Sequence, residues 1–592
     1  MRTDYVPPLR RLRVLNAIII ALIGLLVARL WQIQVLHGAE YLRQSEENRI
    51  RDYTLTAPRG VIYDRKGRPL VSNRPAFTVA ILPLELTHPA RVLPRLAQLL
   101  GLPVGEIQQR IEANRDRPFE PVRIRRDVGA AAVARIEENR MDLPGVIILV
   151  EPVRHYLYGP MAAHVLGYVG EISEEELGQR RDQGYKPGDL IGKSGVERVY
   201  ESVLRGTDGR LRMEVDALGR PLRVLQRVPA IPGRAIVLTL DLTLQKAAFE
   251  GLRTGDQRSG AVVAMDPRTG EILALESMPA YDPNLFAIGI TPQRWQALTR
   301  DPLRPMLNRA LGAAFEPGSV FKIVTATAAL EEGIVGPTST FYAPGYFRLG
   351  RWIFRDLRAW GTVTFLQGIQ NSINVVFYTL GFRLGGETLA AYARKMGLGE
   401  ITGVDLTGEI AGTIPSPSTK QQLIGEPWYP GDAVNMSIGQ GAVTVTPLQV
   451  ARMISSVANG GTLLRPRVLL LAHERDRTAR PADPVVQRSG LYDARALAVL
   501  RAGLRAAVER GTGRATNLTR VAVAGKTGSA ENPRGKPHAW FAGYAPAEAP
   551  RLAVVAFVEH GFRGGLAAAP IVRHVMEAAF PEGTATVREA GR

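Results

Sequence analysis

One stretch near the start of the chain is apolar at almost every position. It covers residues 14–36, and as a helix it would be about 34 Å long, which is enough to cross a bilayer. Its strictly apolar core, residues 17–28, also has the length of the apolar region of a secretory signal peptide. Cleavage requires small residues at fixed positions before the cut, and no such pair lies between residues 28 and 39. The pattern therefore predicts an uncleaved transmembrane anchor.

The charges on either side of this apolar run predict its orientation. Basic residues precede it and acidic residues follow it: Arg2, Arg10, Arg11 and Arg13 against Asp4, then Glu40, Glu46 and Glu47. Positive charge marks the cytoplasmic side of a membrane segment. We therefore expect residues 1–13 to form a cytoplasmic tail and the chain after the anchor to lie outside the cytoplasm. Arg29 lies within the run, where it either extends to the outer interface or pairs with a partner helix.

Beyond the anchor, the apolar and polar positions divide the chain into two domains and a tail. Residues 37–231 hold short strand-like pieces, turns and helices, with no spacing typical of a catalytic site. A composition typical of linkers follows at Pro229-Ala-Ile-Pro-Gly233. We therefore predict a mixed domain at residues 37–231, a second domain at 232–580 and a flexible tail at 581–592.

The second domain combines strand and helix patterns that predict one antiparallel sheet. A strand at 234–240, a helix at 242–252 and a hairpin at 261–275 come first. Three more strands are expected near the end, at 521–523, 538–544 and 552–558, followed by a helix at 570–579. Two early strands and three late ones, with apolar helices between them, predict an α+β fold whose central five-stranded antiparallel sheet is flanked by helices.

Composition narrows the chemistry that this fold can carry. Of the 592 residues, 45% are apolar and 22% are charged, which is ordinary for a globular protein. The absence of cysteine excludes disulfides, thiolate metal sites and cysteine nucleophiles. The eight histidines form no zinc-binding pattern, so we expect neither a metal nor another cofactor. The net charge of +18 suits an anionic partner, but arginines spread along the whole chain do not predict nucleic-acid binding.

A serine and a lysine three residues apart open an apolar helical run in the second domain. Ser319 and Lys322, in Ser319-Val-Phe-Lys322, would share one helix face with Cβ atoms about 5–6 Å apart. A serine hydroxyl needs a base to become a nucleophile, and lysine is such a base only if burial or a second cation lowers its pKa. A helix-capping serine beside a surface lysine is the plain alternative, so this pair alone decides nothing.

Two further groups of polar residues follow in order. Ser372-Ile-Asn374 lies in an apolar helical context and offers a hydroxyl and a carboxamide to a cleft. Lys526-Thr527-Gly528-Ser529 follows the strand expected at 521–523 and combines a cation, a hydroxyl and bare backbone, which suits a carboxylate and a peptide. Residues 188–194 resemble a phosphate-binding loop, but three residues separate their glycines where four are needed, so we do not expect nucleotide hydrolysis.

The order S-x-x-K, S-x-N, K-T-G resembles that of the penicillin-recognising serine enzymes. Ala57-Pro-Arg-Gly60 and Gly192-Lys-Ser-Gly-Val-Glu197 look like the pedestal motifs of class B penicillin-binding proteins. Three further segments look like the elongation-specific branch of that family rather than the division-specific one: Trp428-Tyr-Pro-Gly-Asp432, Ser437-Ile-Gly-Gln-Gly441 and His538-Ala-Trp-Phe-Ala-Gly-Tyr-Ala-Pro546. The resemblance implies an elongated, dimerisation-like pedestal at 37–231 and a penicillin-binding, β-lactamase-like transpeptidase domain at 232–580.

The same resemblance implies the steps of a D-Ala-D-Ala transpeptidase. Ser319 would attack the penultimate D-Ala carbonyl of a peptidoglycan stem peptide, and Lys322 would take its proton. Ser372 would relay a proton to the leaving D-Ala, and Asn374 would orient Lys322 and the substrate amide. An amine of a second stem peptide would then attack the acyl-enzyme and form the cross-link.

Substrate binding is implied for a second set of residues. Lys526 and Thr527, with Gly528, would hold the terminal carboxylate. The backbone N–H groups of Ser319 and Ser529 would form the oxyanion hole. The family usually has threonine where this chain has Ser529, but the amide serves equally well. Further substrate contacts are expected at Trp428, Asp432 and His538.

Partners and location are also implied by the family. The protein would span the bacterial inner membrane once and react with β-lactams. It would act with an elongation-type SEDS-family glycosyltransferase, because pedestal motifs already occupy residues 37–231 and leave no room there for a domain that polymerises glycan. The expected contact surfaces are the anchor helix, with Arg29 facing the partner, and the pedestal at residues 49–59. Three alternatives stay open: a division-specific class B protein, a β-lactam sensor with several spans, and a β-lactamase without a pedestal.

Overall fold

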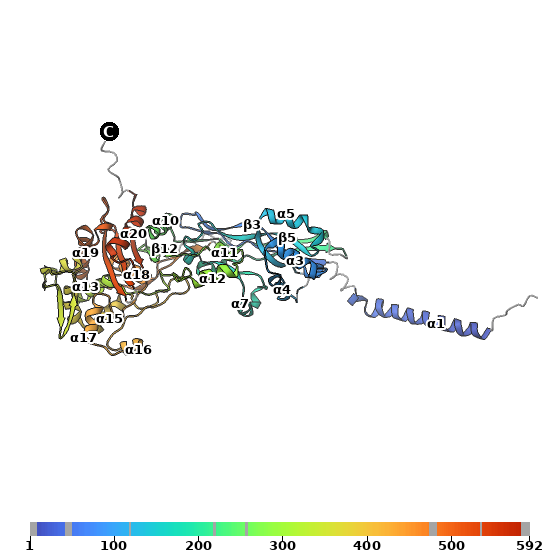
Figure 1. The fold of residues 1–592 in the computed structure, drawn as a ribbon, viewed down its shortest axis with the longest axis horizontal. Helices are drawn as coiled ribbons and strands as arrows, with labels where there is room; N and C mark the ends of the chain where they lie inside the picture. Colours follow the sequence, from blue (N-terminus) through green and yellow to red (C-terminus); the bar gives the residue numbers. More distant parts are fainter. Residues whose placement is uncertain are drawn as a thin grey trace, which may run out of the picture. The chain divides into compact units, whose positions relative to one another are not determined.

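The structure is a computed structural model, and it divides into two compact units (Figure 1). It describes residues 9–41, 50–115, 117, 120–216, 221–254, 259–472, 482–532 and 535–581. Unit 1 comprises Met1–Ala57, Phe77–Glu151 and Thr207–Ile231, and unit 2 comprises Pro58–Ala76, Pro152–Gly206 and Pro232–Arg592. Because the two units alternate along the chain, the domain limits expected at 37, 232 and 580 stay predictions.

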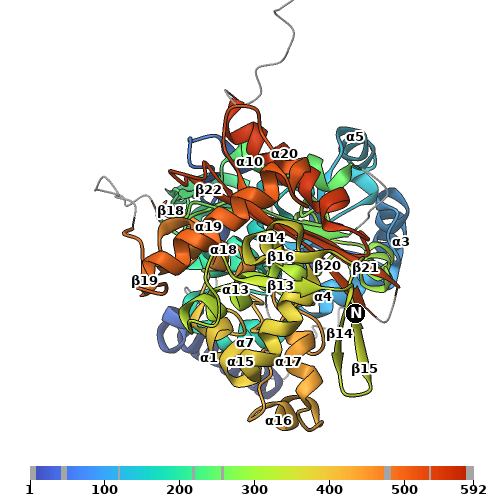
Figure 2. The same cartoon turned by 90° about the vertical axis from the view of Figure 1, so that its left-hand side faces the viewer.

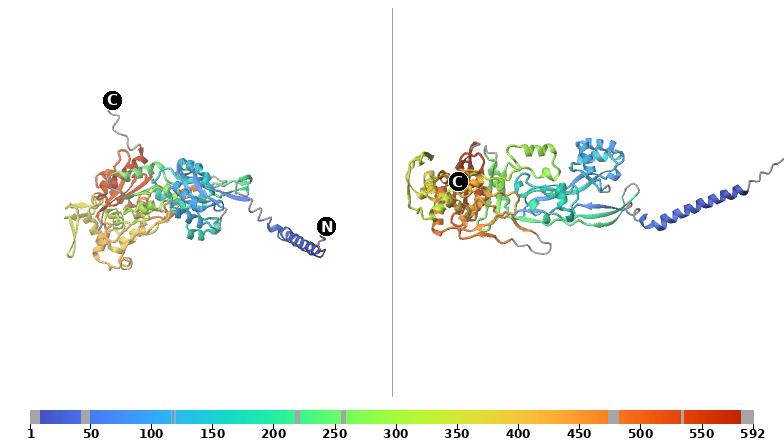
Figure 3. Two further views of the ribbon diagram at one scale, coloured as in Figure 1. Left: turned by 45° about the vertical axis from the view of Figure 1, so that its right-hand side comes forward. Right: turned by 90° about the horizontal axis from the view of Figure 1, so that it is seen from below.

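The apolar helix expected near the N-terminus is confirmed. Helix α1 (Leu9–Trp31) continues into a short π-helix, η1 (Gln32–Leu36) (Figure 3). Leu12–Leu36 is long and apolar enough to cross a membrane, and no other helix in the described part of the chain is. The guanidinium of Arg29 donates to Oε1 of Gln32 at 2.7 Å. This contact within one helix is compatible with both roles considered for Arg29.

Unit 1 contains none of the three sequence motifs. Its first sheet is antiparallel, in the order β1 (Ile50–Leu55), β8 (Gly209–Val215) and β9 (Pro221–Val228). A separate core is shared by strand β4 and three helices: β4 (Val122–Val128), α3 (Pro89–Leu100), α4 (Val104–Glu112) and α5 (Ala130–Glu138). On α3 the buried residues Val92, Leu96 and Leu100 recur every fourth position, which is the spacing that gives a helix one apolar face.

A buried ionic cluster joins two segments of unit 2, residues 58–76 and 152–206. Arg59 Nη2 lies 2.7 Å from Glu197 Oε2 and 2.8 Å from Glu201 Oε2, and Arg154 Nε lies 2.6 Å from Glu197 Oε1. Burial alone would raise the pKa of Glu197, but the charges of Arg154 and Arg59 outweigh it and hold that pKa below its usual value. Losing one partner would leave a buried charge uncompensated, which is strongly destabilising. The cluster therefore holds the two pedestal motifs against each other.

The central sheet of unit 2 is the five-stranded antiparallel sheet that the sequence predicts. Its order is β12 (Ile272–Met278), β11 (Gly260–Met265), β22 (Leu552–Val558), β21 (Gly535–Ala545) and β20 (Ala524–Asn532). On β11, Val262 belongs to a core shared with helices α10 (Leu242–Arg253) and α20 (Gly564–Ala579), whereas its neighbour Val263 belongs to the core that includes α18 (Pro447–Asn459) on the other face. Figure 2 shows these helices beside the sheet. Helices thus cover both faces of the sheet.

Two expected strands differ from the structure. No strand forms at 521–523; β20 begins at Ala524 and itself contains the K-T-G residues, with Lys526 opposite Ala542 of β21. Pairing with an apolar neighbour outweighs the low strand propensity of Gly, Ala and Ser in this segment. The strand expected at 234–240 shortens to β10 (Ile236–Leu238), which lies outside the central sheet and pairs in parallel with β2 (Ile62–Tyr63).

Candidate active site

Ser319 lies in a single 3-10 turn, η5 (Gly318–Val320), that runs directly into helix α13 (Lys322–Glu331). Gly318 has a φ of 53°, and a Cβ at this position would lie 2.6 Å from the carbonyl oxygen of Ser529. Its N–H donates to the carbonyl oxygen of Gly439 at 3.0 Å. Glycine is needed here because other residues fit neither this φ nor this close approach. The half-buried Ser319 therefore lies between strand β20 and the loop at 437–441.

Lys322 is buried at the start of α13, with 1% of its surface exposed. Its Nζ donates to Asn374 Oδ1 at 2.6 Å and to Ser372 at 3.1 Å (Oγ) and 2.8 Å (carbonyl oxygen). Burial lowers the pKa of Lys322 well below its ordinary value, and the charge of Lys526 lowers it further, against an opposite effect of Asp356. The structure thus brings Lys322, Ser372 and Asn374 into contact and places Lys526 within electrostatic reach.

Ser372 and Asn374 occupy the junction of two helices rather than the interior of one. Helix α14 (Phe365–Asn371) ends at Ser372, and α15 (Asn374–Lys395) begins two residues later. Ser372 has φ 59° and ψ 39°, a left-handed conformation that is uncommon outside glycine and that its surroundings must enforce. This sharp turn directs the Ser372 hydroxyl, the Ser372 carbonyl and the Asn374 carboxamide oxygen toward one amine.

Lys526 and Thr527 lie on β20, which is an edge strand of the central sheet. Lys526 is 1% exposed, and burial lowers its pKa to about 7. Its Nζ donates to the carbonyl oxygen of Thr527 at 3.0 Å. The hydroxyl oxygen of Thr527 lies 2.6 Å from that of Thr512. A lysine that titrates near neutrality and two adjacent hydroxyls suit the binding of an anion at this strand.

Gly528 and Ser529 bring β20 against the turn that carries Ser319. A Cβ on Gly528 would lie 2.8 Å from the carbonyl oxygen of Pro317, so only a glycine allows the two backbones to approach this closely. The hydroxyl of Ser529 accepts a hydrogen bond from the Gly564 N–H at 3.2 Å. The main chain of Ser529 and the turn at Ser319 are therefore direct neighbours.

Two side chains that the sequence did not single out belong to the same cluster. Asp356 Oδ2 accepts a hydrogen bond from the Val375 N–H at 3.0 Å and so caps the first turn of α15, beside Asn374. Thr512, after helix α19 (Ala494–Glu509), contacts Thr527. Neither residue has a fixed spacing from a motif, so only the folded chain reveals them.

The other three expected substrate contacts have partners outside this hydrogen-bonded cluster. The Trp428 ring packs on Gly386 of α15, where an added Cβ would lie 2.1 Å from it. Asp432 Oδ2 accepts from the Tyr429 N–H at 2.7 Å and pairs with Lys420 Nζ at 2.9 Å. His538 is 6% exposed, and its ring packs against others: Phe315, Phe557 and His560. A substrate contact by Trp428, Asp432 or His538 stays a prediction.

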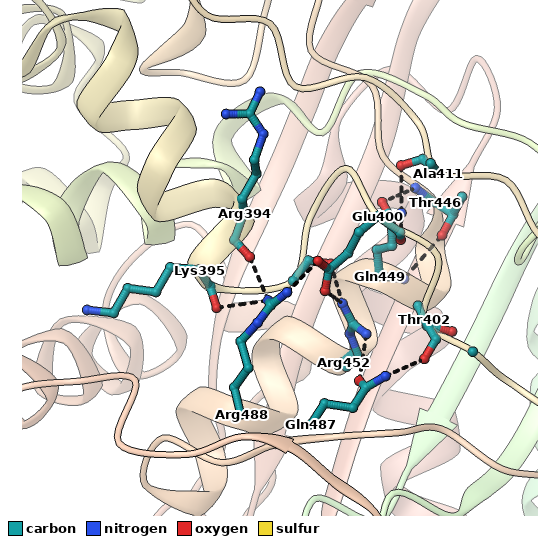
Figure 4. A network of polar contacts seen from close by, with 12 residues as sticks. Arg394, Lys395, Glu400, Thr402, Ala411, Thr446, Gln449, Arg452, Gln487 and Arg488 are labelled. Atoms are coloured by element: carbon teal, nitrogen blue, oxygen red, sulfur yellow. Dashed lines mark hydrogen bonds and ion pairs between the residues drawn. The ribbon is translucent and has the colours of Figure 1, made fainter.

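The far end of α15 is held by arginines that share one carboxylate (Figure 4). Glu400 binds Arg452 Nη2 at 2.6 Å and Arg488 Nη2 at 2.5 Å. Arg488 Nη1 also donates to the carbonyl oxygen of Arg394 in the last turn of the helix, at 2.8 Å. A cation at this end offsets the partial negative charge of the helix C-terminus. The helical geometry of α15 is broken at Gly385 (φ 75°, ψ 167°), so the network fixes the half of α15 after this glycine and not the half that begins with Asn374.

Comparison with known families agrees with this geometry. No group of three or more His, Asp or Glu side chains suited to a metal occurs among the described residues. The family described as penicillin binding protein transpeptidase domain matches residues 260–577, and the family described as penicillin-binding protein dimerisation domain matches residues 54–238. With a buried S-x-x-K lysine beside the edge of a five-stranded sheet, the chain belongs to the class B penicillin-binding proteins.

Two relatives that match nearly the whole chain are named for the same activity. Peptidoglycan D,D-transpeptidase MrdA of Escherichia coli K12 is 32% identical, and the match covers 94% of this chain and 92% of the relative. The MrdA of Acinetobacter baumannii is 35% identical, and the match covers 94% of this chain and 86% of the relative. This chain is a peptidoglycan D,D-transpeptidase.

Solved structures share the fold over a similar length. The complex between penicillin-binding protein PBP2 and MreC from Helicobacter pylori includes a chain with a TM-score of 0.76 and 27% identity, covering 90% of this chain and 99% of that one. A peptidoglycan synthase complex that coordinates polymerization and crosslinking includes a chain with a TM-score of 0.73 and 34% identity, covering 98% of this chain and 99% of that one.

Proposed function

We propose that this transpeptidase cross-links peptidoglycan stem peptides during cell elongation through an acyl-enzyme on Ser319, and that β-lactams acylate the same serine. The environment of Lys322 carries the proposal: a buried amine of lowered pKa, bonded to Ser372 and Asn374, at the start of the helix that the Ser319 turn enters. Relatives named MrdA and PBP2 support the elongation role over the division role. The single candidate span in the described residues argues against a sensor with several spans.

Acylation begins with a proton transfer from the Ser319 hydroxyl to neutral Lys322. The Ser319 oxygen forms a bond to the penultimate D-Ala carbonyl carbon, and the resulting oxyanion accepts hydrogen bonds from the Ser319 and Ser529 N–H groups. In the structure Lys322 Nζ donates to three oxygens, which matches the three N–H groups of the protonated form. When Lys322 is neutral, the Ser372 hydroxyl can donate to it instead, and this reversible bond gives Ser372 its relay role.

Collapse of the oxyanion breaks the peptide bond and releases D-Ala, whose amine takes the proton through Ser372. An amine of a second stem peptide then attacks the acyl carbon of Ser319 and gives up a proton to Lys322, which is neutral at this point. The new amide bond is the cross-link, and the serine oxygen regains a proton from Lys322. Both half-reactions thus use the same base and the same oxyanion donors.

Recognition of the donor peptide is assigned to β20. As an edge strand it presents unpaired backbone groups to which an extended peptide can add as a further strand. Lys526 and Thr527 would hold the carboxylate at the end of that peptide, and Gly528 lets the strand lie against the Ser319 turn. Backbone pairing and a terminal carboxylate together define an acyl donor with a free C-terminus.

The pH dependence of acylation follows from the two lysines. Lys322 must be neutral to act as a base, so kcat/KM should rise with pH through its lowered pKa. Lys526 must be charged to bind a carboxylate, so kcat/KM should fall again as pH rises through its pKa of about 7. A pH profile of acylation by a carboxylate-bearing penicillin, measured from pH 5 to 10, should therefore be bell-shaped.

A charge-preserving variant serves as the control for this profile. Arginine remains protonated above pH 12, so Lys526→Arg should keep the rising limb and lose the falling one. A falling limb that stays near pH 7 in Lys526→Arg would assign it to another group. If wild-type acylation does not vary with pH in this range, neither lysine has its proposed protonation role.

For the membrane arrangement, we propose a single span with a cytoplasmic N-terminus and a periplasmic catalytic domain, as the flanking charges indicate. The proposed partner is an elongation-type SEDS-family glycosyltransferase. A related chain in a complex that couples polymerization to crosslinking supports this partner. A lone helix gains no hydrophobic drive to associate within lipid, so packing and polar contacts must hold it, and Arg29 is the one basic residue available in residues 14–36.

Exchanging residues 14–36 for an unrelated transmembrane helix tests this partnership. We expect co-purification with the glycosyltransferase to weaken by about tenfold, the scale of one to two kcal/mol of interhelical contact. Penicillin labelling should be unchanged. Full retention of co-purification would make the helix only an anchor and assign the contact to the pedestal at residues 49–59. Retention after disruption of that segment as well would refute the partnership.

A further inference from the structure

An exposed hairpin beside the active site carries a cluster of arginines that catalysis does not use. Strands β14 (Tyr346–Leu349) and β15 (Trp352–Arg355) pair antiparallel in unit 2 (Figure 2). Alternate side chains of a strand point to opposite faces. One face packs on α15: the Phe347 and Phe354 rings lie 6.3 and 5.6 Å from the ring of Tyr378. The hairpin is therefore anchored on the helix that begins with Asn374.

The base of the hairpin is joined to the catalytic end of α15 by two hydrogen bonds. Asp356, the residue after β15, accepts from the Val375 N–H at 3.0 Å. The Tyr378 hydroxyl donates to the carbonyl oxygen of Arg355 at 3.2 Å. Burial and the negative charges of Asp356 and Glu531 raise the pKa of Tyr378, which places the hairpin base within electrostatic reach of Glu531 on β20. The base of the hairpin thus lies beside the end of α15 that carries Asn374.

The other face of the hairpin is exposed, basic and aromatic. Tyr346 is opposite Arg355 and Arg348 is opposite Ile353 in the pairing register, so these four side chains share one face. Tyr346 is 42% exposed and Ile353 is 45% exposed, and both arginines are exposed. At the tip, the guanidinium carbon of Arg351 lies 5.2 Å from the ring of Trp352. This outer face therefore combines flat apolar surface with positive charge.

Nothing on the hairpin neutralises that charge. Three arginines lie on the hairpin and a fourth follows it. Within the described ranges, none of the four forms an ion pair with a carboxylate: Arg348, Arg351, Arg355 and Arg358. Asp356 is the one acidic residue from 346 to 360, and its oxygens accept backbone N–H groups of Val375 and Leu357. The positive potential of these exposed guanidinium groups attracts an anionic ligand. Arginine is also the side chain best shaped for bidentate binding of a carboxylate.

We propose that the outer face of the β14–β15 hairpin binds the carboxylate-bearing stem peptides of the acceptor peptidoglycan strand. The inference rests on the proposed function, which requires a second peptide at the site while β20 holds the donor. Arg348 and Arg355 contact the acidic groups of the acceptor peptide, and Tyr346 and Ile353 cover its apolar parts. Aromatic and arginine side chains are the residues that dominate such surfaces. The hairpin thereby orients the acceptor amine toward the acyl group on Ser319.

Charge reversal on this face tests the proposal in the full-length protein in detergent. We expect Arg348→Glu/Arg355→Glu to weaken binding of soluble, uncross-linked peptidoglycan strands by at least about tenfold, because two charge-assisted contacts become repulsive. Acylation by a fluorescent penicillin should stay within about twofold of the wild type, because the donor site is unchanged. Strands whose carboxylates have been amidated should bind both proteins alike. The matched control is Arg495→Glu, an exposed arginine on α19, which should leave strand binding unchanged.

Several results would overturn the inference. Unchanged binding of native strands by the double variant would do so, and so would an equal preference for amidated strands in the wild type. A parallel loss of penicillin acylation would show that the hairpin acts only by supporting α15. Arg348→Gln/Arg355→Gln removes the charges without adding carboxylates and gives the same readout if the glutamate variant does not fold. A wild-type protein that penicillin does not label would refute the proposed function itself, whatever the strands do.

Discussion

Ser319→Ala is expected to abolish both cross-linking and labelling by a fluorescent penicillin. The acyl-enzyme needs a hydroxyl oxygen on the turn that meets β20, and alanine supplies none. Folding should be preserved, because Ser319 is the N-cap of neither η5 nor α13 and its replacement removes no capping hydrogen bond. Gel fluorescence after penicillin treatment measures the labelling, and thermal unfolding measures the stability.

A second serine at a helix start provides the matched control. Ser173 caps helix α7 (Glu174–Gln179) by accepting from the Glu176 N–H. Ser173→Ala should lose about 0.5–2 kcal/mol of stability, the usual contribution of such a cap, and keep full labelling. Labelling that persists in Ser319→Ala would assign the acyl-enzyme to another residue.

Lys322→Arg is expected to slow acylation by at least about 10²-fold, the usual scale for losing a general base. Arginine keeps the positive charge and stays protonated above pH 12, so it cannot take the serine proton. The second-order rate of penicillin acylation, measured at several pH values, tests this expectation. The wild-type rate should rise with pH as Lys322 loses its proton, whereas the variant should stay slow throughout.

The absence of the rising limb in Lys322→Arg separates lost chemistry from a distorted site. Lys395→Arg is the control, because Lys395 lies in the last turn of α15 and pairs with Glu331 at 2.6 Å. It should acylate at the wild-type rate. If Lys322→Arg acylates normally, the proton leaves by another route, and Ser372 or Lys526 becomes the candidate base.

The features that the sequence predicts correctly depend on residues that are close together in the chain. Strands β11 and β22 of the central sheet are apolar runs because helices cover both faces of the sheet. The S-x-x-K residues are also close in the chain: Ser319 lies in a 3-10 turn, and Lys322 begins the helix that follows it. Contacts between residues within one turn depend little on the rest of the fold.

The features that the sequence does not predict depend on segments far apart in the chain. Asp356 caps a helix that begins 18 residues later, and no periodicity links it to Asn374. The strand β20 forms where Gly, Ala and Ser predominate because its neighbour β21 supplies the pairing. The close approach at Gly318 likewise follows from the position of Ser529, more than 200 residues away in the sequence. Such contacts appear only when the whole chain is folded.

The open edge of β20 also bears on the solubility of the protein. An unpaired strand edge pairs with any extended chain, including a second copy of the same protein, and so favours aggregation. One feature limits this here: the exposed Glu531 carries a charge where the strand continues. Pairing with a second copy would bring two such charges close together along the joined edges. The edge that receives the donor peptide is thus protected from self-association by a charged side chain near its end.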